Sequence, residues 1–444
     1  MKMCKNTRSL ALISALLCAA ALPLLEAKGA PEFEEPTVLS AAELLPKADL
    51  SGPFHKVNPR VTSDGYFNNY TIESKFGNET VEGQQLLEIR IGELIAVAEL
   101  DKMSSSKVLG DSAYEGGKAV VTAPVKAVGQ VVDTVSDPKK VQDTVAGIPD
   151  GAERLFSWMY KQAKSGAQAV GDQFSSSTPA PDSGYSSGST LQAGKKLGLD
   201  YLGYSKRERQ LFQKLECNPY TSNQQVQSEV RRVVSIETTV GVAFKFVPSV
   251  ALLSQINTFN TWYDRANKLS LYEEPEGIFK KNKSDLMALG VSEENALAFL
   301  RNKAYNPWTQ RFVANSLFEI GPKVEGHNKF VQLATKAENE PSTLYFVSVS
   351  DAMQKLHTKR PLKKIVSGQH IPAALTRDGL LYLPLSVDYL FWTREVAGIL
   401  EDFRARALKD DKFTSFEIKI RGKASPLARQ KLEAMGAKVF EGSL

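Results

Sequence analysis

The chain has 444 residues, which at roughly 150 residues per domain is enough for two or three domains, so a peptide-sized fold held together by disulfides or metal is excluded. Hydrophobic residues make up 42% of the chain and charged residues 24%, which is typical of a globular protein rather than a disordered, collagenous or polytopic membrane protein. There are 55 Lys and Arg residues against 50 Asp and Glu residues, an excess too small to predict a nucleic-acid partner.

The first 27 residues have the pattern of a signal peptide. Three basic residues, Lys2, Lys5 and Arg8, precede an apolar run over residues 10–25. Cleavage after Ala21 or after Ala27 fits the small-residue rule, and both sites stay open. The sequence therefore predicts an exported protein, secreted or periplasmic.

Removal of this segment leaves Cys217 as the single cysteine, so no disulfide can form within the mature chain. We expect Cys217 to be a small buried hydrophobic side chain rather than an exposed reactive thiol.

Residues 28–164 are predicted to form an N-terminal part that ends at a linker. A Pro-rich arm over 30–59 is followed by a short hairpin around 66–76. Apolar residues then recur at helical spacing over 82–103, which predicts a helix.

A valine stripe over residues 116–160 is the most unusual feature of this part. The stripe steps by four and three residues and would lie on one helical face; it consists of Val121, Val125, Val128, Val132 and Val135. Small residues lie on the adjoining faces of this predicted helix, which would allow close packing. Either the stripe binds a membrane surface or the helices of an envelope protein, or it packs as core against the helix at 82–103.

Ser, Gly and Pro dominate residues 165–194, which predicts a flexible linker, and residues 195–330 then form a helical block. Helices are expected within this block at 205–216, 223–244, 248–271, 284–289, 292–301 and 307–318.

Residues 340–444 change to strand-type patterns that alternate with helical ones. Strands are predicted at 344–349, 379–385, 413–420 and 438–441, and helices at 351–357, 387–408 and 426–435. The expected fold class is therefore α+β or α/β: mainly helical N-terminal and central parts, and a C-terminal α/β portion of mixed or parallel strands.

Polar residues follow the predicted C-terminal strands, where an open α/β sheet forms its ligand crevice. Asp351, Asp388 and Ser425 are candidates for a catalytic site, but each is also a good helix N-cap. His370 lies in a Gly-containing connection and is the best candidate for a general base. Arg421, Lys423 and Ser425 precede a helix start and are candidates for anion binding.

Other motifs do not support enzymatic chemistry. Residues 184–188 match Gly-x-Ser-x-Gly but lack a preceding strand, and residues 110–118 lack the spacing of a phosphate loop. The four histidines have no zinc-ligand spacing, so neither a metal nor another cofactor is expected.

Three motifs carry a resemblance to other proteins. They are Ser63-Asp64-Gly65 with Tyr70-Thr71-Ile72-x-Ser74-x-Phe76-Gly77, then Gly147-Ile148-Pro149-x-Gly151, and finally Asp388-Tyr389-x-x-Trp392-Thr393. Together they resemble a group of secreted bacterial proteins of unassigned function. The resemblance implies a bacterial origin and an envelope location, and it implies no catalytic residue.

The sequence favours an exported bacterial envelope protein of non-catalytic binding or structural type, peripheral to a membrane or bound to an envelope protein. No nucleic-acid partner is expected, and the oligomeric state is left open. The alternative is a hydrolase or transferase with a site on the C-terminal α/β portion, built from Asp351, His370, Asp388 and Ser425.

Overall fold

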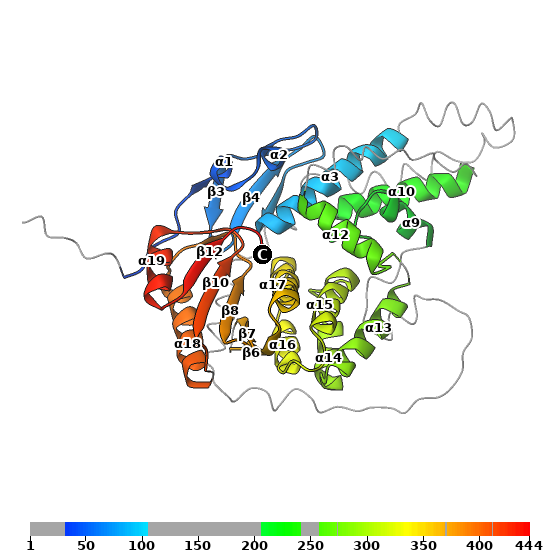
Figure 1. The fold of residues 1–444 in the computed structure, drawn as a ribbon. Helices are drawn as coiled ribbons and strands as arrows, with labels where there is room; N and C mark the ends of the chain where they lie inside the picture. Colours follow the sequence, from blue (N-terminus) through cyan, green and yellow to red (C-terminus); the bar gives the residue numbers. More distant parts are fainter. Residues whose placement is uncertain (1–31, 105–205, 241–256, 273, 369–370, 411) are drawn as a thin grey trace, which may run out of the picture.

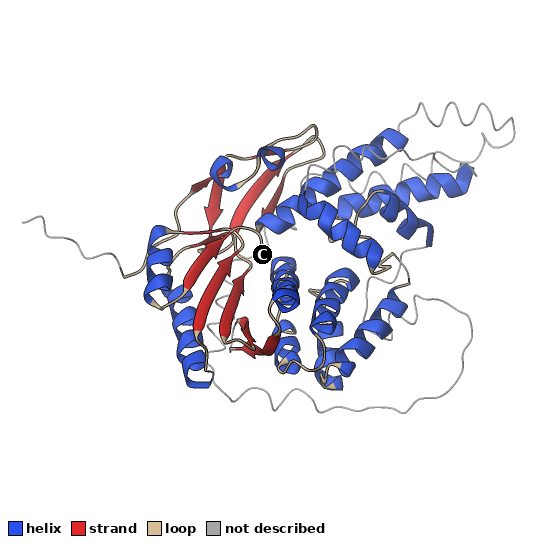
Figure 2. Cartoon of the chain, viewed as in Figure 1, coloured by secondary structure: helices blue, strands red, loops and turns tan. Residues whose placement is uncertain are grey.

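The computed structural model describes residues 32–104, 206–240, 257–272, 274–368, 371–410 and 412–444. Within these ranges the chain combines two larger sheets with a block of helices, as expected for an α+β protein. The strands gather on one side of the molecule and most helices on the other (Figure 2). The predicted valine stripe, the linker, the signal peptide and His370 lie outside the described residues.

The first sheet is built from residues 39–82. Its strands are β1 (Leu39–Ser40), β2 (Lys56–Val57), β3 (Arg60–Ser63), β4 (Asn68–Glu73) and β5 (Glu79–Glu82), and two one-turn helices, α1 (Ala41–Leu44) and α2 (Lys47–Leu50), lie between β1 and β2. The order is β1-β3-β4-β2, with β5 paired to β4, and all pairs are antiparallel.

This N-terminal part contains more strand than the single hairpin that the sequence predicted. Most of its strands have only two to four residues, which is too short for an alternating pattern to develop. The predicted helix that follows is confirmed as α3 (Gln84–Ser104).

The first six of the central helices follow the predicted order. The central helices are α9 (Lys206–Lys214), α10 (Gln224–Val240), α12 (Asn257–Lys268), α13 (Pro275–Ala288), α14 (Glu293–Leu300), α15 (Pro307–Ile320), α16 (His327–Ala334) and α17 (Glu340–Lys359). Helix α13 begins nine residues before the predicted start, with Pro275 in its first turn. Helix α16 was not predicted.

The predicted strand at 344–349 is wrong, because these residues lie in the middle of α17. This helix packs against α15 on one side and against the C-terminal sheet on another, so apolar residues cover most of its circumference and no helical period is visible. Two helix-start signals were present: the Asn339 side chain accepts a hydrogen bond from Ser342 N, and Pro341 follows in the first turn.

The C-terminal sheet has the order β12-β10-β8-β7-β6. Its strands are β6 (Leu362–Ser367), β7 (Pro372–Thr376), β8 (Leu380–Leu385), β10 (Ser415–Ile420) and β12 (Lys438–Glu441). Strands β8, β10 and β12 are parallel and connected through α18 (Arg394–Asp410) and α19 (Pro426–Ala434), whereas β6, β7 and β8 are antiparallel. The prediction of an α/β portion with mixed strands is confirmed, although β6 and β7 were missed.

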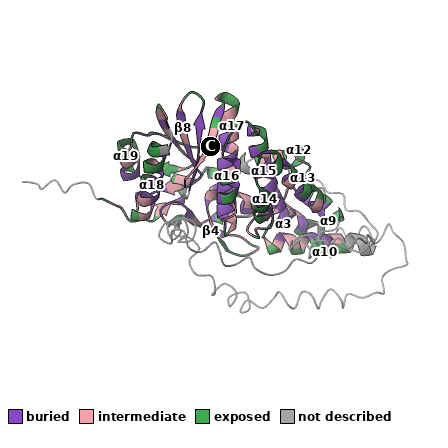
Figure 3. Ribbon diagram, turned by 90° about the horizontal axis from the view of Figure 1, so that it is seen from below, coloured by how far each residue is buried: buried purple, intermediate pink, exposed green. Residues whose placement is uncertain are grey.

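Helices cover both faces of this sheet. Helices α18 and α19 lie on one face and α17 on the other (Figure 1). Exposed residues mark the outer sides of α18 and α19, while β8 and the inner side of α17 are buried (Figure 3). A two-stranded ladder of β9 (Tyr389–Leu390) and β11 (Lys423–Ala424) adjoins the carboxyl ends of β8 and β10.

Candidate functional site

Asp388 joins the C-terminal sheet to the N-terminal part of the chain. Its carboxylate accepts hydrogen bonds from the backbone N–H of Asn68 at 3.0 Å and of Gln84 at 3.0 and 3.1 Å. Gln84 is the first residue of α3, so Asp388 supplies the helix cap from more than 300 residues away in sequence. Its own backbone N–H donates to Tyr66 O at 2.8 Å. The contacts of Asp388 are those of a structural clamp.

Several carboxyl groups around this clamp have raised pKa values. Burial raises the pKa of Asp388 to about 6. Burial, reinforced by the charge of Asp388, raises the pKa of Glu82 to about 7. Because both folded-state values lie above the ordinary ones, the folded chain binds protons that the unfolded chain releases. The stability that these groups contribute is fully present below their ordinary pKa values of 3.8 and 4.5, and it is lost as the pH rises to about 6 for Asp388 and about 7 for Glu82.

Three buried or partly buried histidines make the protein less stable at low pH, opposite to the effect of these carboxyl groups. Burial lowers the pKa of His55, His327 and His357 below the ordinary value of 6.5. The stability that they contribute is present above pH 6.5 and is lost as the pH falls below it. Below pH 6.5 the histidines therefore oppose the gain in stability that the buried carboxyl groups give on acidification.

Ser425 caps α19. Its hydroxyl accepts a hydrogen bond from Ala428 N at 2.9 Å and donates one to the Glu34 carboxylate. The two cations of the predicted anion site also interact with groups of the protein. Arg421 lies 3.6 Å from a carboxylate oxygen of Glu88, and Lys423 Nζ donates to the backbone carbonyl of Glu43 at 2.9 Å.

Asp351 lies on α17 rather than after a strand. Its carboxylate forms ion pairs with Arg265 at 3.1 Å and Lys355 at 2.9 Å. Asp351, Asp388 and Ser425 share no hydrogen-bond partner among the described residues. The structure thus gives each of the three a separate structural contact and does not assemble them around one point.

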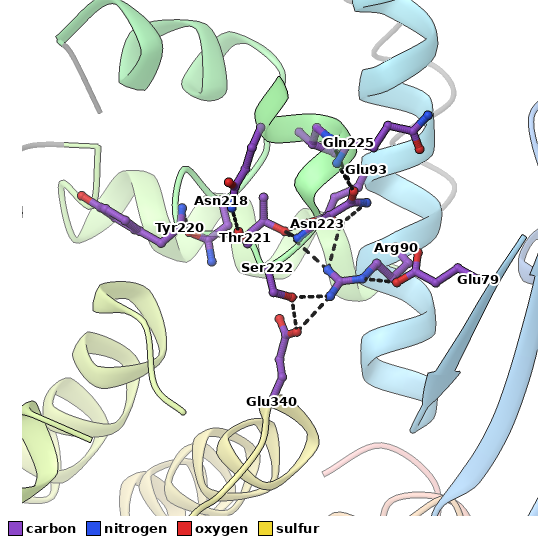
Figure 4. A network of polar contacts seen from close by, with 12 residues as sticks. Glu79, Arg90, Glu93, Asn218, Tyr220, Thr221, Ser222, Asn223, Gln225 and Glu340 are labelled. Atoms are coloured by element: carbon purple, nitrogen blue, oxygen red, sulfur yellow. Dashed lines mark hydrogen bonds and ion pairs between the residues drawn. The ribbon is translucent and has the colours of Figure 1, made fainter. Parts of the chain in front are cut away.

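A second polar centre, which the sequence did not predict, surrounds Arg90 on α3 (Figure 4). The guanidinium donates to Glu79 at 2.9 Å, to Glu93 at 2.9 Å and to Glu340 at 2.9 Å. It also donates to Ser222 Oγ at 2.6 Å. One cation therefore connects β5, α3, the loop before α10 and the first turn of α17.

Glu93 is the most buried carboxylate of this network. The side chain of Arg90 is 5% exposed and that of Glu93 only 1%. Burial lowers the pKa of Arg90, but the charges of Glu93, Glu340 and Glu79 more than offset it, and the net shift is upward. Burial raises the pKa of Glu93, against the effect of Arg90 and of hydrogen bonds from Thr221 and Asn223.

A cavity of about 30 Å³ adjoins the Arg90 network. Space for a single water requires roughly 10–15 Å³ on this measure, so the cavity holds about two waters or one small chemical group. Its walls come from α3, the loop between α9 and α10, α12, and the starts of α15 and α17. The lining residues are Ile89, Glu93, Glu216, Asn218, Thr221, Trp262, Tyr263, Asn306, Trp308, Thr309, Glu340 and Leu344.

Ring packing and hydrogen bonds hold the aromatic walls of this cavity in position. Trp262 packs edge-to-face on Phe312 at a centroid distance of 4.9 Å, and Trp308 packs on Tyr272 at 5.1 Å. Trp308 Nε1 donates to Leu271 O at 3.1 Å. Because edge-to-face geometry is favourable for aromatic pairs, these contacts fix the positions of the two Trp rings, and the cavity walls are in place without a ligand.

Glu216 reaches the cavity from a strained backbone position. It follows α9 with a φ of 56°, in the left-handed region where glycine usually ends a helix. Its carboxylate forms no ion pair with a cation of the described residues. Burial and the nearby charge of Asp264 raise its pKa. The adjacent Cys217 is fully buried and free, as expected.

Comparisons with known proteins identify no relative. No family model, no curated protein and no solved structure matches the chain. No described helix is long and apolar enough to cross a membrane. Nor do the described residues contain a group of three or more His, Cys, Asp or Glu side chains that could hold a metal ion.

Proposed function

We propose that this protein is an exported bacterial envelope protein that binds a ligand without transforming it, and that the ligand enters the cavity between α3, α12, α15 and α17. The observation that carries this proposal is the cavity itself. Five segments spread from Ile89 to Leu344 form it, and packed aromatic side chains fix its walls. Preformed concave sites with a few polar groups are where proteins hold small ligands.

The hydrogen bonds of Glu93 and Thr309 support binding rather than catalysis by these two groups. Glu93 already accepts hydrogen bonds from Arg90, Thr221 and Asn223. The Thr309 hydroxyl donates to Asn306 O at 3.0 Å within a helix cap. A general base must accept a proton from its substrate, and three donors of the protein already occupy most of the acceptor positions of Glu93.

The three described residues considered for a hydrolase or transferase support the same choice. Asp388 caps α3, Ser425 caps α19, and Asp351 is paired with two cations. No contact among the described residues favours that alternative.

Export and association with a membrane surface or an envelope protein remain part of the proposal on the evidence of residues 1–27 and of the valine stripe. N-terminal sequencing of protein recovered from the periplasm or medium tests export. The expected N-terminus follows Ala21 or Ala27, and an intact Met1 would contradict it.

A thermal-shift screen tests the binding site. Small amines, alcohols, carboxylic acids, amino acids and sugars are screened for compounds that raise the melting temperature, since any molecule that binds only the folded state stabilises it. Ile89→Phe should abolish every such shift because the larger ring fills the cavity, whereas Ile89→Val should retain it. Shifts that persist in folded Ile89→Phe would show that the ligand binds elsewhere.

A further inference from the structure

We infer that the cavity receives the ammonium group of an organic amine, a conclusion that rests on the proposed binding function and names the chemistry of its ligand. The size of the cavity is the first argument. Sites for drug-sized ligands usually measure 300–1,000 Å³, whereas this one has about 30 Å³. It accommodates a terminal group, not a nucleotide or a sugar ring.

Charge around the cavity is the second argument. Glu93, Glu216 and Glu340 all contribute to the lining, and among the described residues no Lys or Arg does. Arg90 lies behind the wall, where it is shared among Glu79, Glu93 and Glu340, so the network keeps an excess of negative charge. A buried excess of carboxylates favours a cation over a neutral or anionic group.

Glu216 is the group that can pair with an incoming cation. Its carboxylate is half-buried at the cavity, and no described Lys or Arg neutralises it. The backbone conformation at Glu216 favours Gly and costs stability for any other residue, so the presence of Glu here supports a role for its side chain.

The aromatic walls are the third argument. Trp262, Tyr263 and Trp308 line the same space as these carboxylates. Indole and phenol rings attract ammonium groups through their negative faces, and cages of aromatic side chains recognise alkylated amines in other proteins. The apolar part of an alkylamine also gains contact with these rings.

An anion fits this cavity poorly, although two helices begin there. The N-terminal amides of α15 are not free to donate to an anion, because Trp308 N and Thr309 N already donate to Asn306 Oδ1 at 3.0 Å. Asn339 likewise caps Ser342 N of α17 at 3.0 Å. The positive ends of both helices are thus occupied by the chain's own amide oxygens.

Nuclear magnetic resonance with three probes of similar shape tests the inference. The full-length protein is titrated with butylammonium chloride, butan-1-ol and sodium butyrate at constant ionic strength, and the indole N–H signals of its four tryptophans are followed. We expect butylammonium to shift the signals of Trp262 and Trp308, assigned through single Trp→Phe variants. Its dissociation constant should be at least about five-fold lower than that of butan-1-ol, from cation–π attraction and one ion pair. Butyrate should shift neither signal.

Glu216→Gln isolates the ion pair, and Glu433→Gln on the exposed side of α19 is its matched control. We expect Glu216→Gln to weaken butylammonium about five-fold while leaving the affinity for butan-1-ol unchanged, which also reports that the cavity is still folded. Glu433→Gln should change neither affinity.

Two results would overturn the ammonium inference while leaving the binding function intact: equal affinities for butylammonium and butan-1-ol in both wild type and Glu216→Gln, or a shift on adding butyrate. If none of the three probes moves the two indole signals, the ammonium inference is also overturned. The proposed function is then decided separately by the screen with Ile89→Phe.

Discussion

Replacement of Arg90 by Met should destabilise the protein more than replacement of an arginine that forms an ion pair at the surface. The substitution keeps an unbranched side chain of similar length but removes the guanidinium that donates to Glu79, Glu93 and Glu340. Glu93, which is 1% exposed, is then left ionised with only Thr221 and Asn223 as donors. A buried charge that loses its partner is the costly outcome, rather than the loss of the pair itself.

We expect the free energy of unfolding to fall by about 3–5 kcal/mol, the usual cost of breaking a buried ion pair. At roughly 2–4 °C for each kcal/mol in a larger domain, the apparent melting temperature should fall by about 10 °C. The loss should be smaller at pH 5 than at pH 8. Without Arg90 the pKa of Glu93 rises further, so its carboxyl is protonated in the folded variant at low pH.

Thermal melts and urea unfolding, both followed by circular dichroism, measure the effect. Arg360→Met is the matched control, because Arg360 pairs with Asp378 at the surface, where the two side chains are 38% and 58% exposed. Its loss should cost less than about 1 kcal/mol. The double variant Arg90→Met with Glu93→Gln should recover more than half of the lost stability, because no charge is then left buried without its cation.

The reasoning is refuted if Arg90→Met costs no more than Arg360→Met. It is refuted equally if the double variant is no more stable at pH 8 than Arg90→Met alone.

Three further predictions concern the clamp at Asp388 and its surroundings. Glu82→Gln should be more stable than wild type at pH 8, because it removes a carboxylate whose pKa of about 7 reflects burial and the charge of Asp388. In thermal melts this advantage should shrink as the pH falls below about 7 and be gone near the ordinary Glu pKa of 4.5; equal pH profiles would contradict this. Gly422→Ala should lower the free energy of unfolding in urea by about 2 kcal/mol or more, because a Cβ would lie 1.7 Å from Asp388 O. Its control is Gly277→Ala on α13, where a Cβ meets nothing within 4 Å, and this variant should raise the free energy of unfolding by about 0.5–1 kcal/mol. Ser425→Ala should cost about 1–2 kcal/mol through loss of the α19 cap, and a chain that keeps its wild-type melting temperature would exclude that role.

The C-terminal α/β portion was largely predictable because its elements follow simple periods. Residues 415–420 alternate buried and half-buried side chains, and β10 appears where the pattern predicted it. Helix α19 starts at Pro426 after the cap Ser425, both of which are local signals. Strand β7, in contrast, is buried on every residue and begins with proline, so neither period nor composition distinguished it from a loop.

The candidate residues were predicted in part, but their roles depended on long-range contacts. Sequence position suggested either a catalytic group or a cap for Asp388 and Ser425, and the structure gives caps. For Asp388 the capped helix is α3, not the helix that follows it in the chain. Local pattern identifies a capping residue only when the helix that it caps is the next element.

No local sequence pattern predicted the cavity or the Arg90 network, because both are built from long-range contacts. Glu93 and Glu340 are separated by almost 250 residues, and each is an ordinary helical Glu in sequence. They become unusual only because Arg90 holds both of them beside the aromatic wall. Stability and recognition therefore depend on the same charges: the guanidinium offsets enough of the carboxylate repulsion for the chain to fold, and the charge that it leaves uncompensated favours a cationic ligand in the cavity.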